Sequence, residues 1–141
     1  MVAVVPAYRA RVWRPDAQRA KRPEVTAAQV NQAIADGINY LQRQQKPDGT
    51  WDEIVLGFNG GVTSLCTLAL LTAGVPANDP GIQKALAQIR KIDTKMNYVI
   101  SLQTMVFCLA EPHRDRQLIV RNVKILEQNQ HRGGDGEGGW D

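Results

Sequence analysis

The sequence predicts an all-α protein whose helices form two layers, in which amphipathic outer helices alternate with apolar inner helices. Five stretches of the 141-residue chain have helical apolar periodicity, and amphipathic stretches alternate with stretches that are apolar on nearly every side. No stretch has the strict polar–apolar alternation that is typical of a half-buried strand. Each outer helix pairs with an inner helix, and such pairs must stack to cover their apolar surfaces.

Three amphipathic stretches are expected to form the outer layer. The first begins at Thr26, which can cap a helix together with Gln29 three residues later. Asp79 and Asp115 can cap the other two, because aspartate accepts hydrogen bonds from the first free N–H groups of a helix. The apolar stripe of the first stretch consists of Val30, Ile34, Ile38 and Leu41. The stripes of the other two consist of Ile82, Leu86 and Ile89, and of Ile119, Val123 and Leu126.

Two stretches, residues 61–73 and 98–110, are expected to form the inner layer. The first is apolar on nearly every side with only small hydroxyl residues between, and the second is again apolar on nearly every side. Such a helix is expected to be buried on all sides, which would shield Leu68 and Val106 from water. Gly74 follows the first stretch and is a natural C-terminal cap.

The N-terminal arm, residues 1–25, holds the positive charge of the chain. The chain has 17 Lys and Arg residues against 14 Asp and Glu residues, which gives a net charge of +3. Six basic residues and one acid lie between Tyr8 and Arg22, so this segment carries +5 and the remainder −2. We expect a solvated, disordered tail, because the arm has no sustained apolar stripe. Residues 26–141 are expected to form the one folded domain.

The sequence predicts neither a membrane span nor an export signal. No apolar stretch approaches the length that is needed to cross a bilayer. The short apolar stretch at the start precedes the basic residues, which is the reverse of the order in a signal peptide. The compartment stays open, since export would require a start further upstream.

One short motif occurs twice. The segments QQKPDGTWDE and QNQHRGGDGEGGWD each contain a Gln, a glycine-rich acidic turn and then Trp-Asp. The ends of the preceding outer stretches align with Leu41 opposite Leu126. The inner segments SLCTLALLTAG and SLQTMVFCLAE also align, which pairs Leu65 with Leu102. The chain therefore contains an internal repeat of outer and inner helices.

Each motif is expected to form a clasp between consecutive helices. The Gln side chain can reach free backbone groups at helix ends, and the Trp ring can cover the junction and bury apolar area there. We call Gln45–Trp51 the first clasp and Gln130–Trp140 the second clasp.

The first motif and the helix before it resemble the QW repeat of triterpene cyclases. That repeat has a small residue, an aromatic residue, an aliphatic residue, a Gln and then Gly-x-Trp. The matching positions here are Gly37, Tyr40, Leu41, Gln45, Gly49 and Trp51. Asp36 stands where the family usually has a basic residue, and in the second copy Ile125 replaces the aromatic residue and the turn is longer. The matching positions of the second copy are Gln130, Gly138 and Trp140.

The inner stretches are similar to those of the prenyltransferase and squalene-cyclase repeat superfamily, so the resemblance covers residues 26–141. It implies an α/α toroid, in which a ring of inner helices lies within a ring of outer helices. Full members of the superfamily have more helix pairs than this chain. We therefore expect a partial α/α toroid, an incomplete ring of the prenyltransferase/squalene-oxidase repeat type.

The residues predict no catalytic set, no metal site and no cofactor. Squalene–hopene-type cyclases protonate an alkene with an Asp-x-Asp-Asp motif, which is absent from this sequence. No zinc-ligand spacing relates Cys66, Cys108, His113 and His131, and both cysteines are expected to be small buried thiols. The acids near the two motifs are expected to be turn and cap residues. These acids are Asp48, Asp52, Glu53, Asp135 and Glu137.

Two function classes remain open. In the first, the chain is a non-catalytic scaffold or binding portion, for which the resemblance implies an apolar, isoprenoid-like ligand. In the second, it is the N-terminal fragment of a terpenoid cyclase or prenyltransferase whose catalytic residues lie beyond Asp141. The expected partner is the remainder of a longer toroid, or a second copy that binds through the open edge of the ring. No nucleic-acid partner is expected.

Overall fold

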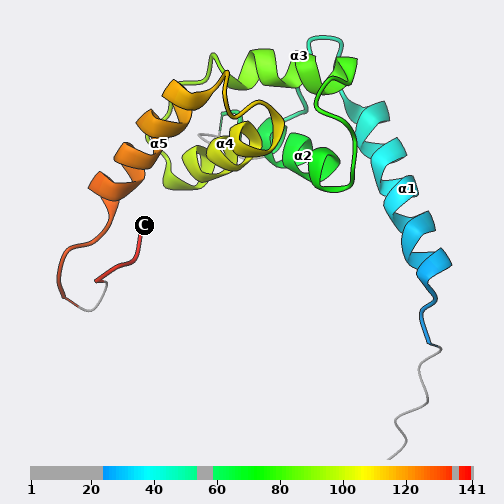
Figure 1. The fold of residues 1–141 in the computed structure, drawn as a ribbon, viewed down its shortest axis with the longest axis horizontal. Coiled ribbons are helices and arrows are strands. Elements are labelled where there is room, and N and C mark those ends of the chain that lie inside the picture. Colours follow the sequence, from blue (N-terminus) through cyan, green and yellow to red (C-terminus); the bar gives the residue numbers. More distant parts are fainter. Residues whose placement is uncertain (1–23, 54–58, 135–136, 141) are drawn as a thin grey trace, which may run out of the picture.

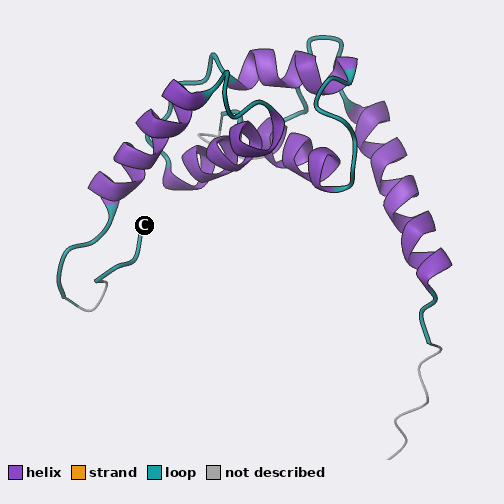
Figure 2. Cartoon of the chain, viewed as in Figure 1, coloured by secondary structure: helices purple, strands orange, loops and turns teal. Residues whose placement is uncertain are grey.

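A computed structural model describes residues 24–53, 59–134 and 137–140 of the chain. All regular secondary structure in these ranges is helical, which confirms the all-α prediction (Figure 2). The predicted disorder of the basic arm concerns residues 1–25, of which 1–23 lie outside the described residues. The helices are α1 Ala27–Gln44, α2 Gly61–Thr72, α3 Pro80–Ile89, α4 Asn97–Ala110 and α5 Arg116–Asn129.

The helices form an arc. The amphipathic helices α1, α3 and α5 follow one another along this arc, and the apolar helices α2 and α4 lie on its concave side (Figure 1). Helices α2 and α4 contact each other, α2 also contacts α1 and α3, and α4 contacts α5. The N-terminal half of α1 extends away from the other helices (Figure 1).

The sequence signals for helix ends are realised at three positions. The Thr26 side chain accepts a hydrogen bond from the N–H of Gln29, and the Gln29 side chain accepts one from the N–H of Thr26. The Asp79 carboxylate accepts hydrogen bonds from the N–H groups of the first turn of α3. Gly74 ends α2 with a φ of 96°, a left-handed conformation that glycine adopts without steric cost.

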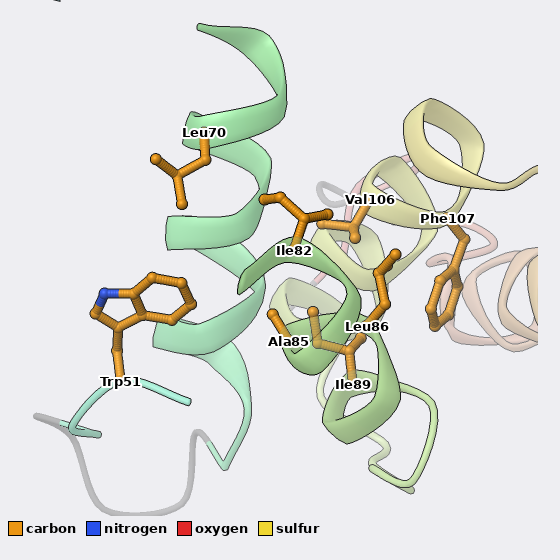
Figure 3. Close-up of a cluster of buried hydrophobic side chains, with 8 residues drawn as sticks. All are labelled: Trp51, Leu70, Ile82, Ala85, Leu86, Ile89, Val106 and Phe107. Atoms are coloured by element: carbon orange, nitrogen blue, oxygen red, sulfur yellow. The ribbon is translucent and has the colours of Figure 1, made fainter. Parts of the chain in front are cut away.

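A core of apolar side chains lies between α3 and the two apolar helices. Side chains from α2, α3, α4 and the turn before α2 converge there (Figure 3). The core consists of Trp51, Leu70, Ile82, Ala85, Leu86, Ile89, Val106 and Phe107. The predicted stripe of α3 is thus fully buried, and α3 is the outer helix with the most complete cover.

The prediction that the inner helices are buried on all sides is wrong. Val106 is buried and Leu68 is half-buried, as the packing of two layers requires. Each of these helices nevertheless exposes one side, where Leu65 of α2 is 46% exposed and Met105 of α4 is 53% exposed. The reason is that the described chain covers only the sides of α2 and α4 that face the outer helices and each other.

The predicted alignment of the two inner helices is also shifted by one residue. It pairs Leu65 with Leu102, yet Leu65 is 46% exposed and Leu102 is 8% exposed. Burial instead pairs Leu70 with Val106, which are both buried, and Ala69 with Met105, which are both exposed. One residue corresponds to a rotation of about 100° around a helix, so the residues that the predicted alignment pairs lie on different faces of their helices.

The outer helices at the two ends of the arc are covered less than predicted. Helix α1 has no buried residue, and Val30 and Ile34 of its expected inward stripe are 46% and 45% exposed. Ile38 and Leu41, which continue this stripe, pack against the core. On α5, Val123 is 40% exposed although it was expected to face inward. Only the parts of these helices next to α2 and α4 have apolar neighbours.

Candidate functional site

The first clasp joins the end of α1 to the start of α3. The Gln45 side-chain amide donates hydrogen bonds to the carbonyl oxygens of Gly49 and Gly81, each at 3.0 Å. The Trp51 indole N–H donates to the carbonyl oxygen of Leu41 at 2.9 Å. The indole thereby satisfies a carbonyl near the end of α1, and the ring is only 5% exposed.

Helix α3 packs against the turn of the first clasp. Gly49 has a φ of 95° and lies so close to α3 that an added Cβ would stand 2.5 Å from the carbonyl carbon of Lys84. The Gln88 side chain of α3 donates to the Asp48 carbonyl at 3.1 Å. Glycine is therefore needed at position 49 for its conformation and for its lack of a side chain.

The second clasp repeats the two side-chain hydrogen bonds that lie within the first. The Gln130 side-chain amide donates to the carbonyl oxygen of Gly138 at 3.0 Å. The Trp140 indole N–H donates to the carbonyl oxygen of Leu126 at 2.7 Å. In both clasps the acceptors are the residue two before the Trp and the leucine four before the Gln.

The backbone of the two turns is paired in the same way. The residue after the Gln, Lys46 or His131, donates its N–H to the residue before the Trp, at 2.8 and 2.9 Å respectively. Its carbonyl accepts from Gly49 or Gly138, at 2.9 and 3.0 Å. The turn of the second clasp is longer, yet it forms both of these backbone hydrogen bonds at the equivalent positions.

The surroundings of the two clasps differ. Trp140 is 50% exposed, whereas Trp51 is 5% exposed. An added Cβ on Gly138 would meet nothing within 4 Å. The second clasp has no counterpart of α3 among the described residues, and this absence accounts for the exposure of its ring.

Two positions of the QW resemblance lie outside the first clasp. Tyr40 is 64% exposed, and an added Cβ on Gly37 would meet nothing within 4 Å. The described structure gives neither residue a packing role. Leu41, in contrast, packs partly against the core and supplies the carbonyl that binds the Trp51 indole.

The acids of the first turn make local contacts. The Asp48 carboxylate accepts from the N–H and hydroxyl of Thr50 at 3.0 and 2.8 Å, and these bonds lower the pKa of Asp48. Asp52 forms an ion pair with Lys46, which raises the pKa of that lysine. Asp135, of the second turn, lies outside the described residues.

Glu53 caps the start of α2, which agrees with its expected role as a turn or cap residue. Its two carboxylate oxygens accept from the N–H of Gly60 at 2.9 Å and from the N–H of Val62 at 3.2 Å. The carboxylate therefore lies at the positive end of α2, whose first N–H groups have no partner within the helix.

An ion cluster that sequence reasoning missed connects α3 to the turn between α4 and α5. The Arg90 guanidinium binds the Asp115 carboxylate through two hydrogen bonds of 2.8 Å, and it contacts Glu111 at 2.5 Å. Asp115 is 3% exposed and does not cap α5 with its side chain, which corrects that prediction. These contacts raise the pKa of Arg90. Nothing in the spacing of these residues signals the cluster, because they meet only through the fold.

The exposed sides of α2 and α4 carry a group of apolar side chains, which we call the inner face. Its largest members, Leu65, Tyr98, Met105 and Leu109, are 46% to 56% exposed. Cys108 also lies there and is exposed, and Cys66 is half-buried with a pKa that burial raises. The prediction of two buried thiols is therefore wrong for Cys108. The inner face consists of Leu65, Ala69, Tyr98, Met105, Cys108 and Leu109.

A cluster of metal ligands and a membrane-crossing helix are both absent from the described part of the chain. No three His, Cys, Asp or Glu residues within it lie close enough together to hold a metal ion. None of its helices combines the length and the apolar character that crossing a bilayer requires. Comparisons of the whole chain with protein-family models, with curated proteins and with solved structures give no match.

Proposed function

We propose that the chain is a repeat segment of an α/α toroid and acts as a non-catalytic scaffold that binds apolar, isoprenoid-like molecules on its inner face. The alternation of outer and inner helices along an arc supports the toroid (Figure 1). The two clasps support it as well, since the same hydrogen bonds recur after α1 and after α5.

The inner face is the observation that carries the binding function. Its four largest side chains come from α2 and α4, whose opposite sides contribute Leu70, Val106 and Phe107 to the core. Burying apolar area stabilises by about 25 cal/mol per Å². An apolar ligand that covers leucine, methionine and tyrosine side chains gains this free energy without displacing any core contact.

The described acids support binding rather than catalysis. Asp48 and Glu53 accept hydrogen bonds from the backbone, Asp115 is paired with Arg90, and Glu111 is paired with Arg90 and Arg114. None of these carboxylates belongs to the inner face. A carboxylic acid that protonates an alkene would have to lie against the bound ligand.

Calorimetric titration with farnesol tests the proposal. We expect Met105→Glu to weaken farnesol binding by about tenfold or more, because it places a charge where the ligand replaces water. The matched control is Val120→Glu on α5, which changes a valine that is 46% exposed and lies outside the inner face. Equal effects of the two substitutions would contradict the proposal, as would turnover of squalene or a prenyl diphosphate by the purified chain.

A further inference from the structure

We propose that the turn between α4 and α5 binds a phosphate group through Arg114 and Arg116. This site goes beyond the proposed ligand binding and shares no residue with the inner face. It rests on a hollow in the surface whose described lining is basic, and on neighbouring carboxylates that are held by another arginine.

The hollow lies beside the end of this turn and the first turns of α5, and its volume is about 620 Å³. The described residues that line it are His113, Arg114, Arg116, Gln117 and Val120. Two of these side chains are permanently cationic, and the His and Gln side chains can also donate hydrogen bonds. None of these five residues is acidic, so an anion in the hollow would meet donors without a competing carboxylate in this lining.

The two guanidinium groups keep most of their hydrogen-bonding capacity. Arg116 is exposed, and its side chain forms neither an ion pair nor a hydrogen bond with any described residue. Arg114 donates one hydrogen bond to Glu111 at 3.0 Å, and its side chain is 60% exposed. Because a guanidinium has five N–H donors, both arginines have donors left for a ligand.

The two carboxylates nearest to the hollow in the sequence are held by Arg90, which does not line it. Asp115 is buried and accepts two hydrogen bonds of 2.8 Å from this guanidinium. Glu111 binds Arg90 at 2.5 Å as well as Arg114. Three guanidinium groups thus face two carboxylates in this region, and the positive charge left over is that of Arg116 in the hollow.

Phosphate is the anion that suits this lining. A phosphate monoester carries a charge of about −1.5 to −2 at neutral pH and has three strong acceptor oxygens, so it can bind two guanidinium groups at once. A carboxylate has one negative charge and two oxygens, which suit a single guanidinium. Val120 is 46% exposed and gives the organic part of a phosphate ester an apolar neighbour. The phosphate can belong to a small ester or to a lipid headgroup.

Amide NMR spectra of the full chain during titration with inorganic phosphate test the site, with sodium chloride holding the ionic strength constant. We expect the signals of residues 113–117 to shift and saturate. Arg116→Gln is expected to weaken phosphate binding by about tenfold or more, because a charge-assisted pair of hydrogen bonds is lost. The matched control is Lys124→Gln, which removes one positive charge from the same helix outside the hollow and is expected to change the affinity by less than about twofold.

A second measurement separates the two sources of the phosphate. The chain is sedimented with phosphatidylcholine vesicles that contain or lack phosphatidic acid. Binding that requires phosphatidic acid and is weakened by Arg116→Gln assigns the site to a lipid headgroup, and binding of inorganic phosphate alone assigns it to a soluble ester.

Two results would overturn the proposal. In the first, neither inorganic phosphate nor the vesicles bind at residues 113–117. In the second, Arg116→Gln and Lys124→Gln weaken binding equally while both keep wild-type helical circular dichroism. Met105→Glu is expected to leave phosphate binding unchanged, which separates this inference from the proposed ligand binding.

Discussion

The two clasp tryptophans make the same hydrogen bond in different surroundings. Each indole donates to the carbonyl of a leucine near the end of an outer helix. Trp51 is then enclosed by the core, and Trp140 is half exposed. Comparing the two residues therefore separates the contribution of the hydrogen bond to stability from the contribution of burial, because the hydrogen bond is the same and the burial differs.

Trp51→Ala is expected to lower the free energy of unfolding by about 2–4 kcal/mol, because it leaves a cavity in the core and an unpaired carbonyl. Trp140→Ala removes the same hydrogen bond with less buried area, and it is expected to cost about 1 kcal/mol. Urea denaturation followed by circular dichroism measures both values. Similar losses for the two variants would show that burial by α3 is not what fixes the first clasp.

Gly49 is constrained by its conformation and by its closeness to α3. Gly74 has almost the same φ, 96° against 95°, but an added Cβ there would meet nothing within 4 Å. Gly74→Ala is expected to cost about 1–2 kcal/mol from left-handed strain alone, and Gly49→Ala about 2–5 kcal/mol, since it also displaces α3. Chemical denaturation of both variants measures the difference. Equal costs would contradict the close contact between the first clasp and α3.

At the scale of elements, the Arg90 cluster fixes the outer layer to the inner layer. It joins the end of α3 to the turn between α4 and α5. Burial alone would raise the pKa of Glu111, but the hydrogen bonds from Arg90 and Gln83 and the charges of Arg114 and Arg90 lower it overall. The ionised carboxylate is therefore the form that the fold stabilises.

This cluster makes stability depend on pH in the acid range. Because the folded pKa of Glu111 is lowered, its contribution is complete above the ordinary glutamate value of about 4.3 and is lost as the pH falls through the folded value. The free energy of unfolding is expected to fall over this range and to fall less in Glu111→Gln. Asp48, whose pKa is also lowered, leaves part of the dependence in that variant. A Glu111→Gln curve parallel to wild type would contradict this account.

At the scale of the whole molecule, the positions and the ends of the helices were predictable from the sequence. The burial of their side chains was not. Periodicity located the stretches that became α2 and α4, and caps such as Thr26 and Asp79 acted locally as expected. Burial depends on neighbours that periodicity does not name. Val30 fits an inward stripe, yet it is 46% exposed.

The candidate site was predictable to a similar degree. The repeated Gln and Trp indicated two clasps, because the Gln–Gly and Trp–Leu hydrogen bonds of each clasp join residues that lie close together in the sequence. The inner face was not predicted, since Leu65 and Met105 belong to helices whose apolar character is typical of full burial. The Arg90 cluster was missed because Asp115 lies 25 residues away from its partner.

The central claim, that the inner face binds an apolar ligand, is tested most directly by methionine-methyl NMR during titration with farnesol. The chain has three methionines, so Met105→Leu assigns the resonance of the inner face. We expect the Met105 methyl signal to shift and saturate as farnesol is added, while Met96, which is half-buried at the start of α4, stays unchanged. Farnesol binding that leaves the Met105 signal in place, or no binding at all, would contradict the claim.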